Sequence, residues 1–166
     1  PSIIDCIWDA EKGRLLVGSA SAKAVQPVLE LFKTTFGMDV TPLTPAGDMP
    51  KLFAAILRGE GYPCEGYTLH PMGSASLAAS EQAVEKAAVA VQNSLNAVAQ
   101  ALEEGMAIQK LHLVATSDAD PDRQLEFTLD AGLAVSGLKL PRAEKGAEED
   151  ATFLVNADVC AAVADM

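Results

Sequence analysis

The chain has 166 residues, of which 49% are hydrophobic and 5% aromatic, and its formal net charge is −11 at pH 7. A chain of this length and hydrophobicity folds around one core or two small subdomains, which excludes wholesale disorder. The acidic charge works against nucleic-acid binding, and the scarcity of aromatic rings works against a single-strand binder that stacks bases. A DNA-binding surface therefore requires that the 12 Lys and Arg residues gather on one surface or that another, basic portion completes it.

The first residues predict a hairpin and a helix. Residues 3–8 and 14–19 are strand-like runs that flank turn residues ending at Gly13, so an antiparallel hairpin is expected. Ser21 is the predicted N-cap of the helix that follows. The apolar residues of this helix recur at helical spacing until Gly37, where we expect the helix to end.

The next segment predicts a short strand, a second helix and a hinge. Residues 38–43 have the length and the proline of an edge strand. Asp48 is the predicted cap of the second helix, which has Pro in its first turn. Residues 59–74 are rich in Gly and Pro, which favours loops, with a short strand at 67–69 between two loop segments. We expect this region to be the hinge between a subdomain at 1–60 and a second one at 61–166.

The second half predicts a long helix followed by a hairpin. Residues 80–104 form an Ala-rich, soluble helix, and Gly105 can take the left-handed backbone angles that end it. Residues 107–115 and 123–129 alternate with the period of a strand. The Asp-rich segment 117–122 lies between them, so an antiparallel hairpin is the simplest connection.

The alternation in the first of these strands assigns its residues to two faces. The mostly apolar face consists of Ala107, Gln109, Leu111, Leu113 and Ala115. The opposite face consists of Ile108, Lys110, His112 and Val114. In the second strand, Leu125, Phe127 and Leu129 lie opposite Gln124, Glu126 and Thr128.

The last part predicts a bent strand at 132–140, an exposed acidic loop at 141–150 and a short apolar strand at 152–155. Asp158 is the predicted cap of a final helix. Together these elements predict an α+β fold with a mixed or antiparallel sheet and packed helices.

Cysteine and histidine usage bounds the chemistry. Cys6, Cys64 and Cys160 are widely spaced, and neither His70 nor His112 stands at ligand spacing from a cysteine. We therefore expect free thiols in a cytosolic protein without a metal or a cofactor. The sequence has no secretory segment and no membrane-spanning run.

Several short segments follow one another in a characteristic order. They are Ile7-Trp8-Asp9, Lys12-Gly13-Arg14-Leu15-Leu16-Val17, Ser19-Ala20-Ser21-Ala22-Lys23, Pro42-Leu43, Arg58-Gly59 and Gly66-Tyr67-Thr68-Leu69. The helix that ends at Gly105, a strand, the acidic turn and a strand opened by Arg123 come next. In this order the chain, from about Ile7 to Val155, resembles the C-terminal half of the RdgC-type recombination-associated proteins of bacteria.

The resemblance implies a non-catalytic, nucleoid-associated protein that binds double-stranded DNA regardless of sequence and limits the loading of a recombinase. Such proteins act as homodimeric rings, so the residues that match basic positions of the family are expected to touch phosphates. The expected DNA-binding residues are Lys23, Lys110, Arg123, Lys139 and Arg142. Family members are about twice as long, so we expect this chain to be a C-terminal portion. Family members usually carry a segment rich in Arg and Lys just before the helix that ends at the glycine. This chain departs from that pattern, because Lys86 is the one basic residue of 75–96.

Two alternatives belong to other classes. A Mg²⁺-dependent exonuclease needs converging carboxylates, and the nearest candidates are Asp118, Asp120, Asp122 and Glu126. Most of these lie in a turn beside a proline, where Asp side chains commonly bond their own backbone. The other alternative is an acidic protein-interaction module, in which the negative charge attracts a basic partner.

Overall fold

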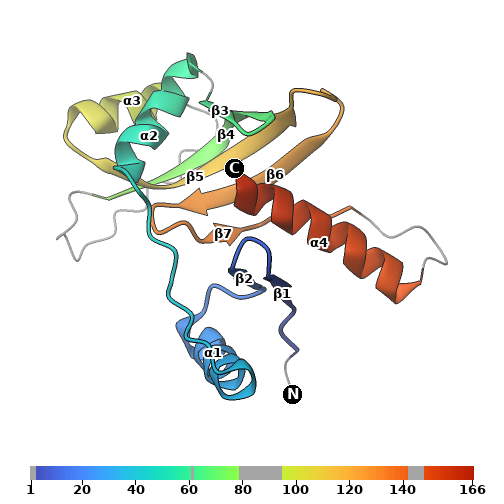
Figure 1. Ribbon diagram of the computed structural model, residues 1–166. Helices are drawn as coiled ribbons and strands as arrows, with labels where there is room; N and C mark the ends of the chain where they lie inside the picture. The colour runs from blue at the N-terminus through green and yellow to red at the C-terminus, as the bar shows by residue number, and fades with distance from the viewer. Residues whose placement is uncertain (1–2, 61, 79–94, 142–147) are drawn as a thin grey trace.

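A computed structural model describes residues 3–60, 62–78, 95–141 and 148–166 (Figure 1). Its elements, in chain order, are β1 (Cys6–Asp9), β2 (Arg14–Val17), α1 (Ala22–Phe36), α2 (Met49–Ala55), the π-turn η1 (Ile56–Glu60), β3 (Tyr62–Cys64), β4 (Tyr67–Ala78), α3 (Leu95–Glu103), β5 (Ala107–Ser117), β6 (Gln124–Asp130), β7 (Val135–Ser136) and α4 (Glu149–Asp165). The strands form a two-stranded and a five-stranded sheet, in which every pair is antiparallel. The predicted α+β class is confirmed, with an antiparallel sheet.

Residues 3–48, here called the N-terminal unit, contain the first hairpin and helix. β1 pairs with β2 from Cys6 opposite Val17 to Asp9 opposite Arg14, as expected from the sequence. Helix α1 ends at Gly37, whose φ of 68° is left-handed and whose N–H donates to the Lys33 carbonyl over 2.8 Å. Ser21 occupies the N-cap position, but its side chain makes no capping hydrogen bond.

The segment between the two helices corrects one expectation and confirms another. Residues 38–43, predicted as an edge strand, are irregular and join neither sheet. Pro42 and Pro45 each lack the N–H group that a strand ladder uses, which disfavours pairing. Asp48 does cap α2, because its side chain accepts a hydrogen bond from the Lys51 N–H over 3.2 Å.

The five-stranded sheet has the order β3-β4-β5-β6-β7. The short strand expected at 67–69 is confirmed as the start of β4, whereas 62–64 and 70–74, expected as loop, also lie in strands. Gly66 turns the chain from β3 into β4 with a φ of 82°. The predicted hairpin of β5 and β6 is confirmed. Helix α3 ends before Gly105, whose φ of 86° is left-handed. Residues 80–94 of the predicted long helix lie outside the described residues.

Two bulges interrupt the pairing of β4 with β5. Residues 72–74 of β4 lie opposite the single residue His112, between the pairs Pro71–Leu113 and Ala75–Leu111. One extra residue, Gln109, lies in β5 between the pairs that involve Lys110 and Ile108. A bulge shifts the alternation of side chains by one residue. For this reason Ile108 is fully buried, although strict alternation had placed it on the polar face.

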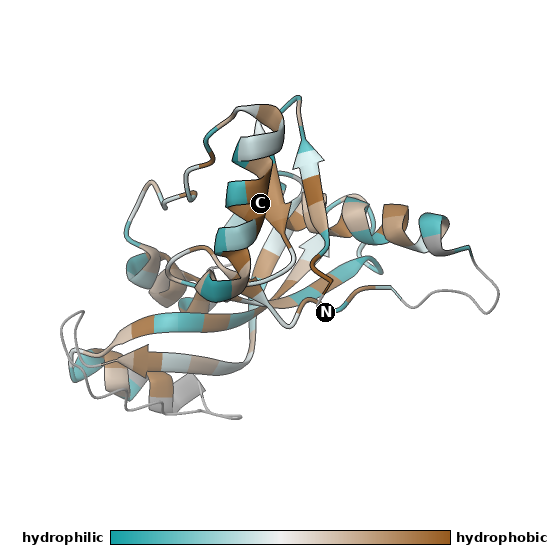
Figure 2. Cartoon of the chain, turned by 90° about the horizontal axis from the view of Figure 1, so that it is seen from below, coloured by the Kyte–Doolittle hydropathy of each residue, from teal (hydrophilic) through white to brown (hydrophobic). Residues whose placement is uncertain are grey.

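The hydrophobic core lies between the five-stranded sheet and the helices α2, α3 and α4. Its buried side chains are Met49, Phe53, Ile56, Leu69, Ala75, Leu77, Val98, Ile108, Leu111, Leu113, Ala115, Leu125, Phe127 and Val159. All lie at or after residue 49, so the core joins α2 to the sheet across position 60/61. The described residues from 49 onward are here called the sheet unit. Figure 2 shows the alternation of polar and apolar residues as teal and brown bands along its strands.

The C-terminal part differs from the prediction in two places. The strand predicted at 132–140 is reduced to β7, and the strand and capped helix predicted around Asp158 form one continuous helix, α4. The apolar run 153–155 is exposed rather than buried, so a sheet does not capture it. The alanines of α4 favour a helix throughout its length.

Candidate nucleic-acid interface

The five-stranded sheet has one face that carries no buried side chain, here called the polar face. It is the face opposite the core residues, as the strand registers show. Its residues on the three central strands are Thr68, His70, Ser76, Lys110, His112, Val114, Thr116, Gln124, Glu126, Thr128 and Asp130. A largely polar sheet face that is open to solvent is a surface on which a large ligand can lie.

A three-residue charge group lies on the polar face. The Glu126 carboxylate places Oε2 2.6 Å from Lys139 Nζ and Oε1 3.2 Å from His112 Nε2. The Lys139 N–H also donates to the Glu126 carbonyl over 2.9 Å, which fixes Lys139 beside β6. The hydrogen bond from Lys139 lowers the pKa of Glu126 below its usual value, and His112 contributes to the same effect.

Lys110 is a basic residue of the polar face on the central strand, β5, near the end at which β6 finishes. It is exposed on β5, between Ser76 of β4 and Asp130 of β6. Asp130 is engaged elsewhere, because its Oδ1 accepts hydrogen bonds from the N–H groups of Gly132 over 2.8 Å and Ala134 over 3.0 Å. Among the described residues, Lys110 Nζ makes no ion pair, so its charge is available to a ligand.

The other predicted DNA-binding residues are less well gathered. Arg123 is exposed where the acidic turn meets β6, next to the end of the polar face. Lys23 is exposed in the first turn of α1, a helix that lies away from the five-stranded sheet (Figure 1). Arg142 lies outside the described residues. The fold therefore brings Lys110 and Lys139 to one face and leaves Lys23 on another part of the chain.

The four candidate carboxylates of a nuclease do not converge. Asp118 Oδ1 accepts a hydrogen bond from the Thr68 hydroxyl over 2.9 Å, and Asp120 Oδ1 accepts one from the Asp122 N–H over 3.2 Å. Glu126 is turned to its two basic neighbours. No group of three or more His, Cys, Asp or Glu suited to a metal ion occurs in the described part of the chain.

The cysteines are not assembled into a reactive group. Cys6, Cys64 and Cys160 form no disulfide with one another. Partial burial raises the pKa of each thiol, with Asp5 and Glu65 adding to this effect at Cys6 and Cys64. A raised pKa disfavours the thiolate, which is the nucleophilic form.

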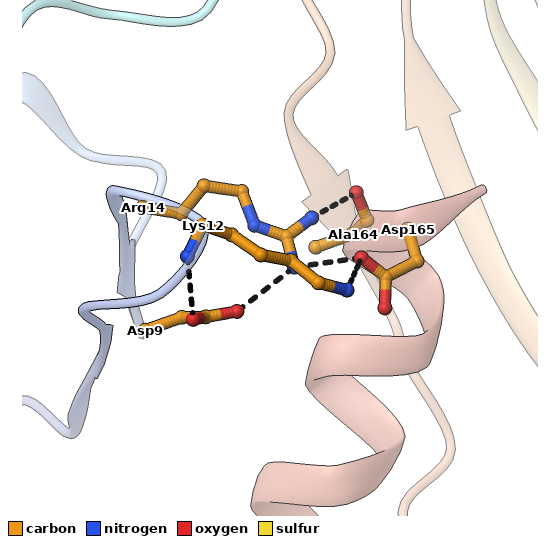
Figure 3. A network of polar contacts seen from close by, with 5 residues as sticks. All are labelled: Asp9, Lys12, Arg14, Ala164 and Asp165. Carbon is orange, nitrogen blue, oxygen red and sulfur yellow. Dashed lines mark hydrogen bonds and ion pairs between the residues drawn. The ribbon is translucent and has the colours of Figure 1, made fainter.

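A second polar group joins the N-terminal unit to the end of α4 and is here called the hairpin–helix network (Figure 3). Arg14 donates to the Ala164 carbonyl over 2.7 Å and pairs with Asp165 at 2.7 Å and Asp9 at 3.3 Å. Lys12 Nζ lies 2.6 Å from Asp165. The two cations therefore bind the carbonyl end of a helix, where positive charge is favourable. Because both are neutralised there, they add little to a DNA-binding surface.

These contacts lower the pKa of both carboxyl groups of the hairpin–helix network. For Asp165 the largest cause is the hydrogen bond from Lys12, followed by that from Arg14. For Asp9 the largest cause is the backbone hydrogen bond from the Lys12 N–H. Sequence patterns could not reveal this network, because its members lie about 150 residues apart.

No protein-family model matches the chain, and no curated protein matches it either. The similarity to RdgC-type proteins thus stays a prediction that depends on the short segments in their order. No helix in the described part of the chain is both long and apolar enough to cross a membrane.

Proposed function

We propose that this chain belongs to a protein that binds double-stranded DNA through phosphate contacts and without reading base sequence. Lys110 and Lys139 on the polar face are the proposed central contacts, with Arg123 beside them and Lys23 and Arg142 as further contacts. The observation that carries the proposal is the position of Lys110, which is exposed and makes no ion pair among the described residues, on the central strand of the polar face. The ordered resemblance to RdgC-type proteins agrees with it.

The charge of the chain limits how such binding can work. Affinity for duplex DNA arises largely from counterions released when Lys and Arg meet phosphates. With a net charge of −11, the chain must present its cations locally, away from its excess of carboxylates. The resemblance further implies a homodimeric ring around the duplex and a role in limiting recombinase loading. In such a ring, phosphate contacts hold the duplex in position without specifying its sequence.

The proposed function needs no bond to be made or broken. Each residue would contribute only its charge and its hydrogen-bond donors, so no metal or organic cofactor is part of the proposal. This separates it from the exonuclease alternative, whose carboxylates bond Thr68, the backbone and basic side chains instead of one another.

Charge reversal in the full-length protein tests the proposal. Substitution of Lys23, Lys110 and Lys139 together by Glu should lower duplex affinity at 50 mM salt and make the slope of log affinity against log salt shallower by about 2.7, because three phosphate contacts are lost. Fluorescence anisotropy of a labelled duplex measures the change. The matched control replaces Lys33, Lys51 and Arg58 by Glu, which changes the net charge equally at exposed positions outside the polar face. Equal affinity of the two triple variants would contradict the residue assignment.

A protein-interaction module is the second candidate, favoured by exposed apolar side chains on the N-terminal unit. Trp8 is 44% exposed, Leu31 68% and Phe36 48%, and α1 has no buried residue. Exposed apolar groups of this kind mark protein interfaces when they gather. A pull-down whose yield falls with salt would support an acidic module that binds a basic partner. A yield that does not change with salt would oppose the acidic module and would indicate a partner that binds the exposed apolar side chains instead.

A further inference from the structure

Glu126 holds both of its basic neighbours by its two carboxylate oxygens. One oxygen lies 2.6 Å from the Lys139 ammonium, and the other lies 3.2 Å from the His112 ring nitrogen. The Lys139 backbone N–H also donates to the Glu126 carbonyl over 2.9 Å, which keeps the two residues side by side. The carboxylate therefore neutralises one of the two lysines that the polar face presents.

The same geometry would suit a phosphate oxygen. A phosphate and a carboxylate are both anions that accept charge-assisted hydrogen bonds from Lys and from protonated His. Glu126 is half-buried on the polar face, and its partners are on β5 and on the segment after β7, so a ligand on this face would meet all three groups. A phosphate that approaches Lys139 must displace Glu126 or meet its negative charge.

We propose that Glu126 is an internal competitor of the DNA phosphates, which weakens duplex binding by occupying Lys139 and His112. This inference rests on the proposed function and adds to it a residue that sets the affinity. Lys110 provides contact without competition, whereas Lys139 becomes a full contact only when the carboxylate is displaced.

The test compares Glu126→Gln with Asp118→Asn in the full-length protein. Both substitutions remove one negative charge with little change in shape, but among the described residues Asp118 bonds the Thr68 hydroxyl and pairs with no basic side chain. Glu126→Gln should bind a labelled duplex about threefold more tightly than Asp118→Asn at 50 mM salt. Its plot of log affinity against log salt should be steeper by about 0.9, the value of one added phosphate contact. Adding Lys139→Gln to Glu126→Gln should remove the gain.

Each other outcome overturns the inference. Equal binding by Glu126→Gln and Asp118→Asn would show that only net charge matters, and it would leave the proposed function in place. A gain that persists in the double variant with Lys139→Gln would show that Lys139 is not the released contact. If neither the wild-type protein nor Glu126→Gln binds duplex at 50 mM salt, although both show native circular dichroism, the proposed function is rejected and this inference with it.

Discussion

The N-terminal unit and the sheet unit are held together by different forces. Every buried hydrophobic side chain among the described residues belongs to the sheet unit, whereas α1 in the N-terminal unit buries none. The N-terminal unit instead has three packed rings, in which Trp8 lies 5.3 Å from Phe32 and 4.9 Å from Phe36 between ring centres. Its attachment to α4 is the hairpin–helix network of ion pairs and charge-assisted hydrogen bonds.

This difference indicates that the two units respond to different conditions. Apolar burial depends little on pH or on moderate salt, so the sheet unit should stay folded across both. Exposed ion pairs are screened by salt and lost when carboxylates are protonated. The attachment of the N-terminal unit should therefore fail before the sheet unit unfolds.

The largest expected effect is a cavity in the core of the sheet unit. Leu113 is fully buried at 0% exposure, so Leu113→Ala should lower the free energy of unfolding by about 2–5 kcal/mol, as measured by urea denaturation. Leu31, which is 68% exposed on α1, is the matched control. Leu31→Ala should change the free energy of unfolding by less than about 0.5 kcal/mol. Equal losses in the two variants would remove the distinction between the units.

An intermediate effect is expected at the hairpin–helix network. Arg14→Gln removes the charge that joins Ala164, Asp165 and Asp9, so hydrogen-exchange protection of β1 and β2 should fall roughly tenfold. Protection of β5 should stay the same, since its neighbours are unaffected. A fall in both units, or in neither, would contradict an attachment by this network.

The network also gives this effect a pH dependence. The pKa values of Asp9 and Asp165 are lowered in the folded protein. The stability that these two carboxylates give to the attachment of the N-terminal unit is therefore complete above about pH 4, and it is lost as the pH falls through their pKa values in the folded protein. Protection factors of β1 and β2 in the wild type should therefore approach those of Arg14→Gln at low pH, while β5 stays protected.

The smallest expected effect concerns the end of α1. Gly37 has a φ of 68°, a conformation that a residue with a side chain adopts at a cost, so Gly37→Ala should destabilise the N-terminal unit by about 1 kcal/mol. Gly47 has no positive φ, and no atom lies within 4 Å of the position that an added methyl group would take, so Gly47→Ala should be neutral or slightly stabilising. Fluorescence of Trp8, the only tryptophan of the chain, reports unfolding of this unit. A greater loss for Gly47→Ala would contradict the assignment.

Local signals in the sequence predicted a large part of the fold. The first hairpin, the end of α1 at Gly37, the Asp48 cap and the hairpin of β5 with β6 all depend on residues close in sequence. The errors arose where distant contacts decide the structure. Pairing with β5 extends the strand expected at 67–69 through the Gly- and Pro-containing residues 70–78, and a bulge at Gln109 buries Ile108. Periodicity along the chain indicates neither the pairing nor the bulge.

The candidate site could be predicted only in part for the same reason. Alternation along β5 placed Lys110 on the polar face, because strand period alone decides its side. The contact of Lys139 with Glu126 spans 13 residues and a turn, and no spacing rule relates the two. The hairpin–helix network links opposite ends of the chain, so only the tertiary structure reveals it.

One titration decides whether the polar face binds DNA by phosphate contacts. Duplex affinity of the full-length protein is measured by fluorescence anisotropy between about 50 and 200 mM salt. Five contacts per protomer, at Lys23, Lys110, Arg123, Lys139 and Arg142, predict that log affinity falls with log salt with a slope of about −4.5 or steeper. Absence of binding at 50 mM salt, or an affinity that does not change with salt, would contradict the proposed function and favour a protein-interaction module.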